Sequence, residues 1–179
     1  MKRLFLVAGL CVAAALVAPI ASASAATEFV GSCAIQGTAS FGGVALPKTE
    51  PALLGYSFDS GPGTTCSGVI IEGAAEVTVN EANAKAHVEG KGELSCAHSK
   101  STTPGSGSVT IKGKTAVFTG FEFVAAGVDV TFTINGGESL ASGSASFAGD
   151  TAGVKQCAEP GVSGPKELAF TAAAKGKLG

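Results

Sequence analysis

Tryptophan is absent from this chain, and tyrosine, arginine and methionine occur once each, at Tyr56, Arg3 and Met1. Proteins that bind nucleic acids need a basic surface, usually with arginine side chains that clamp phosphates. Modules that bind sugar rings or bases rely on exposed tryptophan and tyrosine side chains as stacking platforms. The composition therefore excludes a nucleic-acid binder and argues against a carbohydrate-binding module.

The first 25 residues have the three parts of a secretory signal peptide. Met1-Lys2-Arg3 is basic, residues 4–20 are apolar and uncharged, and residues 21–26 contain overlapping Ala-x-Ala cleavage sites. We expect cleavage after Ala25, with Ala23 as the alternative. The apolar run is slightly short for a membrane span, which takes about 20 residues. The sequence thus predicts a secreted protein, extracellular or at the cell surface, with no stable membrane insertion after cleavage.

Residues 26–179 are expected to form one domain after the signal peptide of residues 1–25. They contain ten lysines, no arginine and fourteen acidic residues, which gives a formal charge of −4. The lysines are spread without a cluster, so no basic patch for an anionic membrane is visible. No linker or charge run divides this segment. A domain of this length buries about 70% of the surface of its unfolded chain.

Four cysteines remain once Cys11 leaves with the signal peptide, namely Cys33, Cys66, Cys96 and Cys157. An even number of cysteines in a secreted chain predicts two disulfides. No Cys-x-x-Cys pair or Cys/His spacing of a zinc site is present. Three pairings are open, and we favour Cys33–Cys66 with Cys96–Cys157, in which the two loops do not cross.

The apolar residues recur with period two, which is typical of β-strands. The clearest strand runs from Ala84 to Cys96, where small and apolar residues alternate with charged ones. A second covers residues 128–134 and is followed by Asn135-Gly136, which favours a tight hairpin. After Gly120 the apolar parity shifts by one residue, as a β-bulge would cause. The segment Lys166–Leu178 fits either a strand or a helix, and we favour a strand.

Further strands and their connecting loops complete the predicted architecture. Strands are expected at residues 29–35, 52–58, 67–71, 75–79 and 141–147, and loops at residues 46–51, 99–106 and 159–165. Val109 and Ile111 lead through Lys112-Gly113-Lys114 to a further strand that carries Ala116 and Phe118. We predict no helix with a phosphate-binding loop. Nine or ten short antiparallel strands predict an all-β fold, a single β-sandwich of the jelly-roll or immunoglobulin-like type.

No residue pattern in the chain indicates a catalytic, metal or cofactor site. His87 and Glu89 lie on one face of a predicted strand and could offer two metal ligands, but no third ligand is visible. A solvated face of alternating charges explains them better. Either His87 or His98 could join a serine and an acid from distant parts of the chain, yet no nucleophile motif is present. We therefore expect no enzyme.

Three non-enzymatic roles remain open, with an unknown extracellular protein or a small ligand as partner. The first is an extracellular binding or surface structural module. The second is a carrier of a small apolar ligand, because Gly90 and Gly92 on the inner strand face leave room for a pocket. The third, less favoured, is a protease inhibitor that presents the segment Cys157–Pro160 beside a disulfide.

Overall fold

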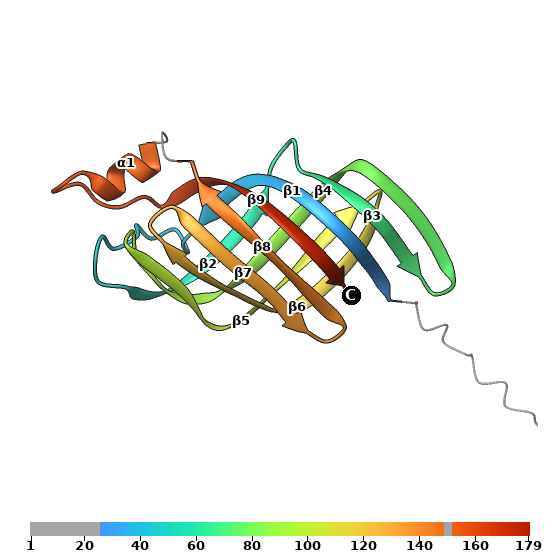
Figure 1. Ribbon diagram of the computed structural model, residues 1–179. Helices are drawn as coiled ribbons and strands as arrows, with labels where there is room; N and C mark the ends of the chain where they lie inside the picture. The colour runs from blue at the N-terminus through green and yellow to red at the C-terminus, as the bar shows by residue number, and fades with distance from the viewer. Residues whose placement is uncertain (1–25, 149–151) are drawn as a thin grey trace, which may run out of the picture.

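The computed structural model describes residues 26–148 and 152–179, so the expected signal peptide lies outside the described residues. These residues form nine β-strands and one short α-helix (Figure 1). The strands are β1 (Thr27–Ser40), β2 (Ala52–Ser60), β3 (Thr65–Glu72), β4 (Ala75–Leu94), β5 (His98–Ile111), β6 (Lys114–Ala126), β7 (Asp129–Gly136), β8 (Ser139–Phe147) and β9 (Glu167–Leu178), and the helix is α1 (Ala152–Ala158).

The strands belong to one antiparallel sheet that closes on itself, so the prediction of a β-sandwich was wrong. From β3 to β9, each strand pairs with the next along the chain. The last strand, β9, then pairs with β1 over twelve residues, from Phe29 opposite Leu178 to Ser40 opposite Glu167. The result is an eight-stranded barrel with one extra strand. Period-two alternation has one buried face in both architectures, so it does not distinguish a barrel from a sandwich.

The extra strand arises because β2 and β3 share one position in the wall, between β1 and β4. The second half of β1 pairs with β2, and its first half pairs with β3. Residues 61–64 connect β2 to β3 and are not part of the sheet. Thr64, only 2% exposed, closes this excursion: its Oγ1 donates to the Gln36 carbonyl and accepts from the Gln36 amide, each at 3.1 Å. The wall therefore stays continuous across the break.

Phenylalanine rings fill the barrel interior and lie next to glycines on neighbouring strands. Phe132 is directly opposite Gly143, and Phe118 is directly opposite Gly107. A Cβ atom added to Gly143 would lie 2.3 Å from Phe132 Cζ, and one added to Gly107 would lie 2.7 Å from Phe118 Cζ. Each glycine thus makes the space that the opposed ring occupies.

Several sequence-based predictions about strands are confirmed. The segment Lys166–Leu178 is almost wholly strand β9. In β4, Ala84 and Leu94 are buried while the charged residues between them face outward. The bulge is also present: Ser106 pairs with Thr119 and Gly105 with Phe121, which leaves Gly120 as the extra residue at φ +75°.

Other local predictions were wrong. Two separately predicted strands, residues 75–79 and 84–96, form the single strand β4. The loop predicted at residues 99–106 lies within β5, and α1 was not predicted. The β7–β8 turn consists of residues 137 and 138 rather than Asn135-Gly136, because Gly136 already pairs with Ser139.

Both predicted disulfides are confirmed. Cys33 and Cys66 are directly opposed on β1 and β3, just beyond the break in the wall. Cys96, in the β4–β5 turn, bonds Cys157 in α1 across 61 positions of sequence. Two disulfides are consistent with an extracellular location. The described part of the chain contains no helix long and apolar enough to cross a membrane.

Candidate functional site

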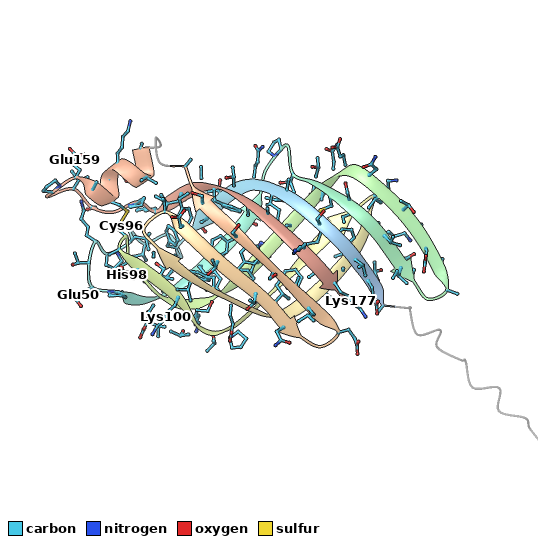
Figure 2. The ribbon with its side chains drawn as sticks, in the orientation of Figure 1. Glu50, Cys96, His98, Lys100, Glu159 and Lys177 are labelled. Carbon is cyan, nitrogen blue, oxygen red and sulfur yellow. A yellow bond between two sulfur atoms is a disulfide. The ribbon has the colours of Figure 1, made fainter. Side chains whose placement is uncertain are left out.

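The helix α1 lies at one end of the barrel, which we name the covered end (Figure 1). It consists of the β1–β2 loop (residues 41–51), the turns at residues 95–97 and 127–128, α1, and the segment 159–166. Figure 2 shows Cys96 and Glu159 at this end and Lys177 at the opposite end. The covered end is therefore built from four separate parts of the sequence.

Backbone hydrogen bonds join these connections into a continuous rim. The Leu46 amide donates to the Pro165 carbonyl at 2.9 Å, and the Cys96 amide donates to the Pro47 carbonyl at 2.8 Å. Three further bonds of 2.9–3.0 Å continue around the rim. In them the backbone amides of Gly127, Phe147 and Ala148 donate to the carbonyls of Ala97, Val128 and Ala169, respectively. Because the backbone groups are paired with one another, the rim is formed before any ligand arrives.

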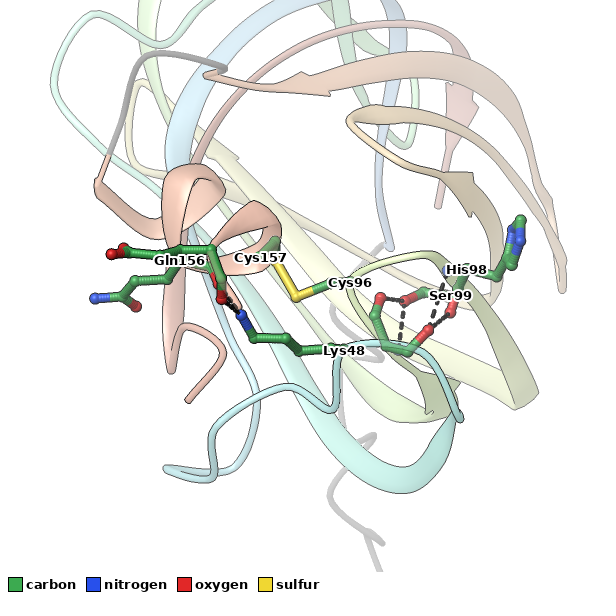
Figure 3. Close-up of a disulfide and its surroundings, with 8 residues drawn as sticks. Lys48, Cys96, His98, Ser99, Gln156 and Cys157 are labelled. Carbon is green, nitrogen blue, oxygen red and sulfur yellow. Dashed lines mark hydrogen bonds between the residues drawn. A yellow bond between two sulfur atoms is a disulfide. The ribbon is translucent and has the colours of Figure 1, made fainter. Parts of the chain in front are cut away.

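Serine side chains fix the turn that carries Cys96. The Ser95 hydroxyl donates to the His98 carbonyl at 2.8 Å and accepts from the His98 amide at 3.0 Å. The Ser99 hydroxyl donates to the Ser95 carbonyl at 2.9 Å and accepts from the Ser95 amide at 3.1 Å. These four bonds hold the turn rigidly, so the disulfide partner in α1 has a fixed anchor (Figure 3).

Two independent ties hold α1 over the covered end, although none of its residues is buried. The first is the disulfide Cys96–Cys157. The second is the Lys48 ammonium, which donates to the carbonyl of Gln156 at 2.7 Å and to the carbonyl of Glu159 (Figure 3). Both ties act on the C-terminal end of the helix.

Between α1 and the barrel lies a pocket of about 310 Å³. Its walls are mostly apolar and come from the loops, the helix and the strand ends. The apolar side chains are Phe41, Leu46, Leu94, Ala97, Ala125, Val128, Phe147, Val154, Ala158 and Leu168. Polar groups include Lys48, Ser95 and Ser99. The pocket therefore combines an apolar wall with a few polar groups, which is the usual make-up of a small-molecule site.

The barrel interior leaves much less space. A cavity of about 90 Å³, lined almost wholly by apolar groups, lies among the interior phenylalanines. Phe147 lines both this cavity and the pocket at the covered end. Gly90 was expected to leave room for a ligand, but Tyr56 fills that space: a Cβ atom on Gly90 would lie 2.4 Å from the Tyr56 hydroxyl oxygen.

Burial raises the pKa of Tyr56, while its hydrogen bond to Ser101 opposes the rise.

The candidate metal pair of the sequence, His87 and Glu89, lies on the outer face of β4. His87 Nδ1 is 2.6 Å from Asp59 Oδ1 on β2, and His87 Nε2 is 3.7 Å from Glu89 Oε2. The hydrogen bond to Asp59 raises the pKa of His87, and Glu89 adds to this, while partial burial opposes it. No group of three or more metal-ligating side chains occurs within residues 26–148 and 152–179.

The same cluster contains a serine, but not in the order of a catalytic triad. Ser57 Oγ donates to Asp59 Oδ2 at 3.1 Å, so the hydroxyl and the imidazole both contact the carboxylate. A nucleophilic serine instead needs the imidazole as its own partner. His98, the other histidine considered, lies at the covered end. The segment Cys157–Pro160, considered as an inhibitory loop, begins with the last two residues of α1.

Sequence reasoning missed the pocket but contained one signal for it. That signal is the predicted disulfide between Cys96 and Cys157, which places the segment around Cys157 beside the turn between β4 and β5. Residues 152–158 have no apolar stripe that would mark a helix. Comparison of the chain with protein-family models, with curated proteins and with solved structures found no match in any of the three.

Proposed function

We propose that this protein is a secreted carrier of a small apolar molecule, which it binds in the pocket between α1 and the barrel. The observation that carries the proposal is a pocket of about 310 Å³ with an apolar wall and a preformed rim. This volume falls at the lower end of the range for small-molecule sites, about 300–1,000 Å³. The proposal is one form of the broader expectation of an extracellular binding module.

The interior cavity of the barrel is a poorer candidate for the site. Its volume of about 90 Å³ is below the roughly 150 Å³ of an apolar cavity that accepts benzene. The rings that surround it pack tightly: Phe58 lies 5.9 Å from Phe121 and 5.7 Å from Phe170, measured between ring centroids. A ligand would have to displace these rings, whereas the pocket at the covered end needs no such rearrangement.

A carrier outside the cell must keep its site formed without help from other proteins. The disulfide Cys96–Cys157 and the Lys48 bonds hold α1 in place, and the Cys33–Cys66 disulfide stabilises the wall. These features suit an oxidising, dilute environment. Export through the predicted signal peptide would provide that environment.

The proposal is tested by titrating the oxidised protein, residues 26–179, with the neutral fluorescent probe N-phenyl-1-naphthylamine. We expect saturable binding with one site. Replacing Val154, which lines the pocket from α1, by tryptophan should fill the pocket and weaken binding at least about tenfold, because the probe loses buried apolar area.

Val124→Trp is the matched control, since Val124 lies on the outer face of β6 and is 61% exposed. This variant should bind the probe like the parent protein. The proposal is wrong if the parent protein shows no saturable binding, or if Val154→Trp and Val124→Trp bind equally well.

A further inference from the structure

We infer that the ligand carries an anionic group, of the carboxylate class, which Lys48 binds at the edge of the pocket. This inference rests on the proposed function and adds the chemical class of the ligand. Lys48 belongs to the β1–β2 loop, is half-buried, and lines the same pocket as Leu46 and Val154. A positive charge beside an apolar wall matches an amphiphile with an acidic head and an apolar tail.

The Lys48 ammonium has a donor to spare. An ammonium group has three N–H donors. Two are directed at the carbonyl oxygens of Gln156 and Glu159, which belong to α1 and the residue after it. Figure 3 shows the side chain extended toward the helix, beside the disulfide. The third donor remains for a ligand in the pocket that Lys48 lines.

The charge of Lys48 also has no anionic partner among the described residues. Lys100, Lys114 and Lys177 each pair with a glutamate at 2.7–3.1 Å. No such ion pair involves Lys48, whose partners in residues 26–148 and 152–179 are neutral carbonyls. The nearest acids along the sequence and the helix, Glu50 and Glu159, have exposed side chains. The half-buried charge is therefore compensated only in part.

Partial burial makes an anion at this position favourable. Hydrogen bonds between charged groups are about twice as strong as those between neutral groups. The screening by water that weakens surface ion pairs is reduced beside an apolar wall. His98 also lines the pocket, but its side chain points away from Lys48 in Figure 3. Lys48 is thus the specificity-determining residue for the acidic head.

Two ligands with the same ten-carbon chain, decanoate and decan-1-ol, test the inference by calorimetric titration of the oxidised protein. We expect the parent protein to bind decanoate about tenfold to a hundredfold more tightly than decan-1-ol. Lys48→Met keeps the length of the side chain and removes its charge. This variant should lose the preference for decanoate and bind decan-1-ol within about twofold of the parent.

Lys85→Met, on the outer face of β4, is the matched control and should keep the preference. Equal affinity of the parent protein for the two ligands would overturn the inference and leave the proposed function standing. A loss of decan-1-ol binding in Lys48→Met would also overturn it, because Lys48 would then act only by holding α1. If the parent protein binds neither ligand, and N-phenyl-1-naphthylamine as well fails to bind, the proposed function fails together with the inference.

Discussion

At the scale of single residues, the interior is built from large rings placed over glycines. Tyr56 opposes Gly90 and Phe132 opposes Gly143 across neighbouring strands. A barrel of eight strands has an interior just wide enough for side chains to fill. Large rings fit there only where the opposite residue is small. The glycines that seemed to leave space for a ligand in the barrel are therefore part of its packing.

Gly143→Ala tests this packing directly. The added Cβ would lie 2.3 Å from both Phe132 Cζ and the Ala173 carbonyl oxygen, and a backbone atom cannot move aside cheaply. We expect the free energy of unfolding to fall by about 1–3 kcal/mol, measured by urea denaturation. Gly55→Ala is the control, since its Cβ would meet no atom closer than 3.9 Å. A Gly143→Ala variant as stable as Gly55→Ala would contradict the packing argument.

His87 gives a second prediction at this scale, through the pH dependence of stability. Its hydrogen bond with Asp59 raises its pKa, so the folded state binds the proton more tightly than the unfolded state. The stabilisation is present below the unfolded-state pKa of about 6.5 and is lost as the pH rises through the folded-state pKa. The stability difference between the parent protein and His87→Gln should therefore be larger at about pH 6 than at about pH 8.

The size of this effect should stay below about 1 kcal/mol, because exposed ion pairs are screened by water. The His87 and Asp59 side chains are 45% and 58% exposed. The measurement is an NMR titration of His87 together with denaturation at both pH values. Asp59→Asn should lower the pKa of His87, and a parent value at or below about 6.5 would contradict the assignment.

At the scale of the elements, the broken strand β2–β3 shows how the wall tolerates an interruption. The Gly61 amide donates to the Gln36 carbonyl at 2.6 Å, and the Ala84 amide donates to the Thr64 carbonyl at 3.0 Å. The Ser60 hydroxyl accepts from the Ala86 amide at 2.6 Å. Side chains and turn carbonyls thus satisfy the backbone groups that regular pairing would have used.

Thr64→Val should weaken this junction. Valine has the same shape as threonine, but the backbone amide of Gln36 loses the hydroxyl partner that the buried Thr64 supplies. We expect a loss of about 1–3 kcal/mol in the free energy of unfolding, measured by thermal or urea denaturation. In the control, Thr110→Val, the hydroxyl lost is exposed and pairs with the Thr115 hydroxyl, so the change should stay within about 0.5 kcal/mol. Equal losses in the two variants would show that the junction does not depend on Thr64.

The elements also show what the sequence could and could not predict. Strand parity was predictable because each strand has one buried face, as in β4, where Ala84 and Leu94 point inward. The helix α1 was not, because its position depends on a distant disulfide and on Lys48 rather than on a pattern of its own. The pocket was missed for the same reason: its walls come from several connections that meet only in the closed barrel.

At the scale of the whole molecule, closure depends on the seam between the first and last strands. A pattern of alternating residues says nothing about which strands meet, so the choice between sandwich and barrel rests on the β1–β9 pairing. The curvature at this seam comes from small residues. Gly31 pairs with Gly176, and a Cβ on Gly176 would lie 2.3 Å from the Leu140 carbonyl oxygen on the next strand. The strands can therefore approach closely and curl the sheet into a barrel.

An engineered disulfide tests the seam. Ala34 on β1 and Ala173 on β9 are directly opposed and exposed, so the double variant Ala34→Cys/Ala173→Cys should form a third disulfide without loss of the native two. A bond closing a loop of more than about 100 residues stabilises by up to about 4–5 kcal/mol in the chain-entropy model. We expect a higher midpoint of thermal unfolding and the new bond in peptide mapping by mass spectrometry.

In the control for this experiment, the second cysteine is placed on β8 instead of β9. Ser144 on β8 opposes Ala173, so it lies two strands from Ala34. Two strand spacings are about 9–10 Å, beyond the roughly 7 Å within which two Cα atoms can be bridged. Ala34→Cys/Ser144→Cys should therefore keep two free thiols. If the Ala34/Ala173 variant also keeps free thiols, then β1 and β9 do not meet and the sheet is open. Only closure of the sheet places these first and last strands next to each other.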